Sequence, residues 1–151
     1  MEGKSELLNR IMNTIDVGMV FVDADNKLAF FSRAAGELLN VEPEERIGTS
    51  VFLCHPKELV QQVQQRIDDI RKDPQRRTKG RIVNYQGRYL HETFYSVSDE
   101  KGVYLGIAGV FQDVGEKVSL LKQLGKFEEP RVFGVGEMAP RKPNYLSACK
   151  A

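Results

Sequence analysis

The chain has 151 residues, 41% of them hydrophobic, which is enough for one globular domain with a real core. Its 22 basic and 21 acidic side chains nearly cancel, so no overall field draws it to nucleic acid or to an anionic membrane. The longest apolar runs, such as 17–22, fall far short of the roughly 20 residues that a membrane span needs. The two cysteines, Cys54 and Cys149, and an N-terminus without an apolar leader predict a cytoplasmic protein with reduced thiols.

The first half of the chain predicts a helix, a hairpin and several further helices. Residues 5–15 carry apolar side chains at helical spacing. The runs VGMVFVD and LAFFS flank the turn DADNK, which predicts a β-hairpin. Short helices are expected from residue 33 to about residue 48. Pro56 then opens a run with apolar residues every three or four positions, which predicts a longer helix with His55 as its N-cap.

The second half predicts a meander of three strands followed by a helix. The runs RIVNY, RYLHETFYSVS and VYLGIAGVFQDV are separated by turn signals at Gln86-Gly87 and at DEKG. The expected fold class is therefore α+β: a five-stranded antiparallel sheet with helices on one face and flanking N- and C-terminal amphipathic helices. The expected division is a flanking helix at 1–15, a domain at 16–115, a C-terminal signalling helix at 116–127 and an extended tail at 128–151.

Several short motifs carry a family resemblance. FFSR at 30–33, ERIGTSV at 45–51, CHP at 54–56, DEKGVYLG at 99–106 and VFQDV at 110–114 resemble the PAS family, over about residues 12–116. The CHP followed by an amphipathic helix looks most like the PAS domains of hemerythrin-like proteins and the haem-bearing PAS domains of carbon-monoxide-responsive regulators. This resemblance implies a signal-transduction sensor that binds haem through His55 and detects a diatomic gas or a redox state.

The resemblance and the alternation of strand residues together predict a pocket between the sheet and the helices. In the last strand, Leu105 is expected to point inward with the pocket residues, and Gly109 to leave space for something flat or small. His55 is the expected iron ligand. The candidate pocket residues are His55, Cys54, Leu90, Glu92, Phe94, Ile107, Gly109 and Phe111. An inward Glu92 opposes haem, because a buried carboxylate is costly unless paired, and it could instead hold a small polar ligand.

Other readings of these residues stay open. His55 can cap its own helix or bond a backbone group, and Cys54 is interpreted as a buried structural thiol. Met19 in the first strand is a candidate sixth iron ligand, whereas His91 is expected on the outer face of the sheet. The basic segment 71–81 has no interleaved aromatic residues and is interpreted as a solvated loop, so we expect no nucleic-acid contact.

The sequence contains none of the common catalytic motifs, so we expect a sensor and not an enzyme. The apolar stripes of the two flanking helices predict a homodimer, through Leu8, Ile11, Ile15, Leu121 and Leu124. The effector that receives the signal is expected in another domain or another protein. The alternative is a PAS domain without haem that acts as a dimerisation or protein-interaction module or binds a small polar ligand.

Overall fold

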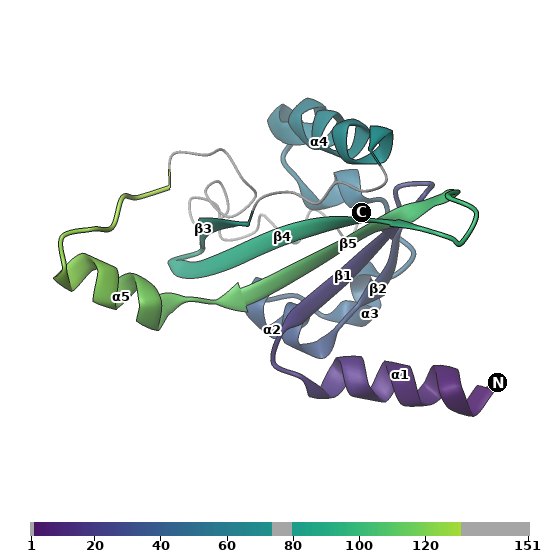
Figure 1. The fold of residues 1–151 in the computed structure, drawn as a ribbon, viewed down its shortest axis with the longest axis horizontal. Coiled ribbons are helices and arrows are strands. Elements are labelled where there is room, and N and C mark those ends of the chain that lie inside the picture. Colours follow the sequence, from purple (N-terminus) through teal and green to yellow (C-terminus); the bar gives the residue numbers. More distant parts are fainter. Residues whose placement is uncertain (1, 74–79, 131–151) are drawn as a thin grey trace.

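The computed structural model of the chain describes residues 2–73 and 80–130 (Figure 1). Within these residues, five α-helices and five strands follow one another, with two short 3-10 helices before α4. Their bounds are α1 (Glu2–Thr14), β1 (Gly18–Asp23), β2 (Leu28–Phe31), α2 (Arg33–Leu39), α3 (Pro43–Arg46), η1 (Val51–Cys54), η2 (Lys57–Leu59), α4 (Val60–Lys72), β3 (Arg81–Tyr85), β4 (Arg88–Ser98), β5 (Tyr104–Asp113) and α5 (Gly115–Gln123).

The strands form one antiparallel sheet in the order β2-β1-β5-β4-β3. In Figure 1, α4 lies above the sheet, α2 and α3 lie at its lower side near β1 and β2, and α1 and α5 extend away from the body of the domain. The predicted α+β class and the five-stranded antiparallel sheet are confirmed. No helix among the described residues is long and apolar enough to cross a membrane.

Two tight turns fix the register of the sheet. In the first hairpin, the Asp23 carboxylate accepts hydrogen bonds from the amides of Asp25 and Lys27, at 2.9 and 3.0 Å. In the second, Gln86 and Gly87 both have positive φ, 52° and 84°, as a two-residue turn between twisted strands requires. This turn places Arg81 of β3 directly opposite Glu92 of β4.

Apolar side chains of the helices pack on the inner face of the sheet in three clusters. Ala35 of α2 packs with Leu28 and Phe31 of β2, and Ile67 and Ile70 of α4 pack with Ile107 of β5; the third cluster joins Val83, Tyr85 and Leu90. Removing this apolar surface from water is the main force that holds the helices on the sheet. The inner face is therefore where a ligand would meet both layers.

Two helix boundaries differ from the prediction. α4 begins at Val60 with Leu59 as its N-cap, so the assignment of His55 as N-cap is wrong. His55 instead ends η1, and both it and Pro56 have extended ψ values, 148° and 147°, which interrupt the helical path. The C-terminal helix ends at Gln123, before the expected residue 127.

The predicted inward direction of Leu105 is also wrong. The pairing of β4 with β5 shifts between Val97 and Ser98, where Val97 faces Gly106 and Ser98 faces Tyr104. The shift leaves Leu105 without a partner, and its side chain is 44% exposed. Most of the predicted extended tail, and residues 74–79 of the predicted basic loop, lie outside the described residues.

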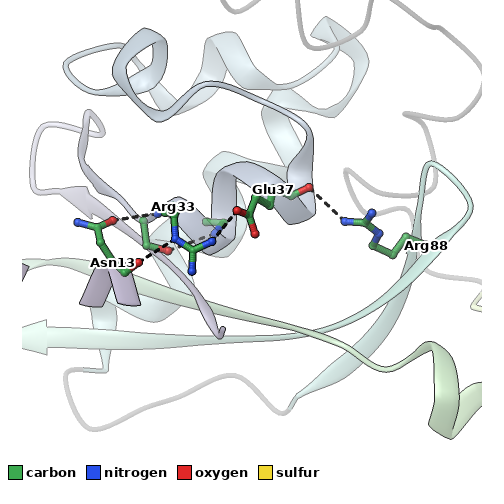
Figure 2. A network of polar contacts seen from close by, with 6 residues as sticks. Asn13, Arg33, Glu37 and Arg88 are labelled. Carbon is green, nitrogen blue, oxygen red and sulfur yellow. Dashed lines mark hydrogen bonds and ion pairs between the residues drawn. The ribbon is translucent and has the colours of Figure 1, made fainter. Parts of the chain in front are cut away.

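A polar network attaches α1 to the rest of the domain (Figure 2). The Arg33 amide donates to Asn13 Oδ1 and the Arg33 guanidinium to the Asn13 carbonyl, both at 2.9 Å. Arg33 also pairs with Glu37 along α2. Arg88 of β4 donates to the Glu37 carbonyl at 3.1 Å. The last turn of α1 is thus connected through α2 to the beginning of β4.

Candidate functional site

A cavity of about 190 Å³ lies between the inner face of the sheet and the α4 side of the domain. All five strands contribute to its wall, because alternate residues of each strand point inward. Most of the lining side chains are apolar, and they include Val20, Val22, Phe31, Val63, Ile67, Val83, Leu90, Phe94, Ile107 and Phe111. A cavity of this kind, apolar with a few placed polar groups, is typical of a small-molecule site.

One part of the cavity wall is strongly polar. Glu92 of β4 is only 8% exposed, and its Oε1 accepts a hydrogen bond of 2.6 Å from Arg81 Nε. Arg66 of α4 approaches the same oxygen with one terminal nitrogen at 3.8 Å. Its guanidinium also lies 5.1 Å from the centroid of the Phe94 ring. The buried Glu92 carboxylate is therefore paired with Arg81 of β3 and, at longer range, with Arg66 of α4.

Arg66 is in an unfavourable place for a positive charge. Its pKa is lowered, first because burial removes water from the guanidinium and second because Arg81 is nearby, while Glu92 acts in the opposite direction. The guanidinium remains charged, because the ordinary pKa of arginine lies far above neutral pH. The two arginines thus share one carboxylate at this end of the cavity.

His55 lines the cavity from the end of η1. Its Nδ1 lies 2.8 Å from the Val51 carbonyl oxygen. A carbonyl can only accept, so Nδ1 carries the proton and Nε2 of the neutral ring keeps its lone pair. The pKa of His55 is lowered chiefly by burial and further by the charge of Arg66, although the hydrogen bond to Val51 opposes the shift. The structure therefore holds one defined, uncharged tautomer beside the cavity.

The remaining candidate residues also lie on the cavity wall: Cys54, Leu90, Phe94, Ile107, Gly109 and Phe111. Gly109 does not leave the free space that the sequence suggested. A Cβ there would lie 3.0 Å from Phe94 and 3.3 Å from Phe111. These two rings meet edge to face with centroids 6.0 Å apart. The missing side chain at Gly109 accommodates the aromatic pair.

Met19 does not lie on the cavity wall, so its assignment as a sixth ligand is wrong. The neighbouring residues Val20 and Val22 line the cavity, and strand alternation turns Met19 to the opposite face. His91 likewise lies between the cavity residues Leu90 and Glu92 and points to the outer face, as expected.

The two arginines of the site were missed by the sequence analysis. Arg81 was counted with the solvated basic segment 71–81, although the Gln86-Gly87 turn places it opposite Glu92. Arg66 lies three residues after Val63 and four before Ile70, which is the apolar face of α4. A charged residue on a helix stripe that faces a buried acid was the signal that could have identified it.

The residues present fit haem only in part. Nε2 of His55 is the kind of nitrogen that ligates haem iron. However, pockets for drug-sized ligands usually measure about 300–1,000 Å³, and the cavity measures about 190 Å³. The wall also carries the charged Glu92–Arg81 pair, which is unfavourable beside an apolar macrocycle. Among the described residues, no group of three or more His, Cys, Asp or Glu side chains could hold a metal ion by itself.

Comparison with known proteins agrees with this fold. The family model described as "PAS domain" matches residues 8–115, and the chain belongs to the PAS family. No curated protein sequence matches the chain.

Several solved structures are similar in fold. A C-terminal domain from Streptococcus mutans is 22% identical, with 77% of this chain and 89% of that chain covered and a TM-score of 0.64. The PAS domain of Bordetella pertussis BvgS is 16% identical, with 82% and 95% covered and a TM-score of 0.62. The VqmA protein of Vibrio cholera, solved with a ligand and DNA, is 14% identical, with 87% and 62% covered and a TM-score of 0.56.

The lowered pKa of His55 makes a prediction about stability and pH. Above pH 6.5, the ordinary value, the ring is neutral in both the folded and the unfolded chain. As the pH falls below that value, the unfolded chain takes up the proton first, so the free energy of unfolding decreases until the lower folded pKa is reached. Urea unfolding at about pH 7.5 and about pH 5 should show a smaller acid loss in His55→Gln than in the wild type.

His91→Gln is the matched control, because His91 is the only other histidine of the chain. It should keep the acid loss of the wild type. An equal acid loss in the wild type and in His55→Gln would show that His55 is not held in its neutral form.

Proposed function

We propose that this PAS domain is a sensor that binds a small organic molecule in the cavity beneath α4 and passes the signal to its flanking helices. The observation that carries the proposal is the cavity itself, which is apolar over most of its wall and holds the Arg66, Arg81 and Glu92 side chains at one end. An apolar wall supplies affinity, and a few fixed polar groups supply orientation and specificity. The domain acts by binding and not by catalysis.

Similar structures support ligand binding by this fold. The structure of VqmA from Vibrio cholera was solved as a ligand and DNA complex, and that of a phage VqmA as a complex with DPO. The phage protein shares 10% sequence identity with this chain, at a TM-score of 0.60. Sequence identities this low support a shared fold but do not carry over the identity of a ligand. The ligand of this chain must therefore be argued from its own residues.

The route from the cavity to the flanking helices runs through β4. Leu90 and Glu92 line the cavity, and Arg88, at the start of the same strand, bonds the end of α2. The Tyr89 hydroxyl accepts a hydrogen bond of 3.2 Å from Lys122 of α5. If β4 can take two positions, a ligand that binds one of them more tightly shifts the equilibrium toward that position, by an amount set by the difference in affinity.

A substitution that fills the cavity should abolish binding. Val63 lies on the cavity wall, and Val63→Phe adds volume there. Val103→Phe is the matched control, because Val103 is 57% exposed. We suggest six probes: benzoate, phenylacetate, hexanoate and the three corresponding amides. At least one should shift the methyl resonances of Ile67, Ile70 and Ile107 in the wild type and in Val103→Phe, but none should do so in Val63→Phe. If none of the six shifts these resonances in the wild type, the proposed ligand function is wrong.

Haem is the second candidate ligand, and the Nε2 lone pair of His55 favours it. When bound, haem would supply an iron centre for a diatomic gas or for a redox change. The chain would hold the iron through Nε2 of His55, whose ring is oriented by its bond to Val51. The cavity would have to widen, since its volume of about 190 Å³ is below the roughly 300–1,000 Å³ usual for drug-sized ligands.

A titration with haemin tests this candidate. If His55 ligates the iron, the wild type and His91→Ala should develop the same shifted Soret band, and His55→Ala should lose it. The His91 side chain lies off the cavity, so its removal leaves the site intact. An unshifted Soret band in the wild type, or an unchanged one in His55→Ala, contradicts haem ligation by His55.

We also propose that the domain forms a homodimer through its flanking helices. Helix α1 and the residue that follows it expose Leu7, Leu8, Ile11 and Ile15 by 40 to 57%. Helix α5 and its C-cap residue expose Leu120 and Leu124 by 55 and 67%. Leu8 also lines an open groove of about 1350 Å³ between α1, α2 and α3. Exposed apolar stripes on helices are often covered by a partner. A second copy supplies a complementary apolar stripe at the required place.

Analytical ultracentrifugation of the full chain tests the dimer. We expect the wild type to sediment as a dimer and Ile11→Glu as a monomer, because a charge in the apolar stripe loses its water on association. Asn9→Glu adds the same charge at an exposed polar position of α1 and should remain dimeric. A monomeric wild type would contradict the proposed dimer.

A further inference from the structure

The polar end of the cavity contains more positive than negative charge. Arg66 and Arg81 both face it, and Glu92 is the carboxylate that they share. Glu92 is the one carboxylate, and no aspartate or lysine is present, among the described lining residues. His55 contributes no charge near neutral pH, because burial holds its pKa below the ordinary value.

Glu92 lies much closer to Arg81 than to Arg66. Arg81 Nε donates to Glu92 Oε1 at 2.6 Å, which is a short, charge-assisted hydrogen bond. The Arg66 nitrogen lies 3.8 Å from that oxygen, too far for a hydrogen bond. Among the described residues, Arg66 therefore has a long ion pair and the face of the Phe94 ring to offset its lost hydration. Its donors are the ones that remain available to a ligand.

A ligand can reach the Arg66 guanidinium from solvent. Its side chain is 39% exposed and that of Glu92 10%, so the guanidinium lies between solvent and the buried carboxylate. Val63 and Ile67 flank it along α4, and Phe94 lies beneath it. A ligand could thus place an acidic group on Arg66 and bury an apolar body against these side chains.

We propose that the ligand of this cavity is a small organic monocarboxylate with a compact apolar body, held by its carboxylate on Arg66 close to Arg81. A planar carboxylate matches the paired donors of a guanidinium. Its single negative charge would balance the charge of Arg66, which Glu92 neutralises only at long range. The volume of about 190 Å³ restricts the body to a short chain or a single ring. This inference rests on the proposed ligand function and names the class of ligand.

Glu92 has a specific part in this site. It is the internal carboxylate that lies closest to the position where the ligand's carboxylate would bind, so the two repel each other. Glu92→Gln keeps an oxygen that can accept from Arg81 but removes the charge. This variant should bind carboxylates more tightly than the wild type, whereas a merely structural role for Glu92 predicts weaker binding or none.

Calorimetric titration of the full chain with the acids and amides named above tests the inference. We expect the wild type to bind at least one acid about tenfold or more tightly than its amide, because a charge-assisted bond is lost in the amide. Arg66→Gln should abolish this preference, so that the acid binds no more tightly than its amide. Arg71→Gln is the matched control: Arg71 lies on the same helix, and its guanidinium stacks on Tyr104, 4.9 Å from the ring centroid, away from the cavity wall. It should keep the preference.

The outcomes separate the two proposals. Amides that bind as tightly as their acids would overturn the carboxylate inference and leave the ligand function standing. Preference for the acid that survives in Arg66→Gln, or tighter binding that fails to appear in Glu92→Gln, would also overturn it. Failure of all six compounds to bind the wild type would overturn both. Circular dichroism melting of each variant identifies those that are folded, and the Glu92→Gln result stands if Arg66→Gln does not fold.

Discussion

The buried ion pair between Glu92 and Arg81 determines the character of the cavity. A carboxylate in the middle of a sheet loses most of its hydration, and breaking such a buried pair by removing one partner typically costs about 3–5 kcal/mol. Glu92 is tolerated because the register of β3 and β4 places Arg81 directly opposite it, where the two can form a bond of 2.6 Å. The tight turn at Gln86-Gly87 therefore decides whether the inner face of the domain is stable.

Helix α4 depends on the same pair. Ile67 and Ile70 hold it to the sheet by apolar packing against Ile107, which is insensitive to small shifts. Arg66, by contrast, is oriented by a distant carboxylate and by the Phe94 ring. An electrostatic contact in a poorly hydrated place is stronger than in water and falls off with distance. The position of α4 is thus the feature of the domain most responsive to a new charge in the cavity.

Much of the fold could be predicted from the sequence, because strand alternation and helical spacing are local signals. The meander, the first hairpin and α2 follow from such patterns. The start of α4 could not be predicted, since Pro56 is compatible both with a first helical position and with the extended backbone that it adopts. The bulge beside Leu105 could not be predicted either, because the apolar pattern of a single strand does not show where its pairing with the next strand shifts.

The site shows a similar division. Alternation alone places Leu90, Glu92 and Phe94 together, and a two-residue turn then makes Arg81 the partner of Glu92 by simple counting from the turn. Arg66 requires more, because the contact of α4 with the sheet depends on the path of the chain through η1 and η2. A basic residue on an apolar helix stripe is ambiguous by itself, since long side chains can reach solvent from such positions. The buried Glu92 on the facing strand resolves the ambiguity. A carboxylate on the inner face of a sheet requires a cation, and here Arg81 supplies it. A second cation can approach the same carboxylate only from the helix packed against that face, which is α4.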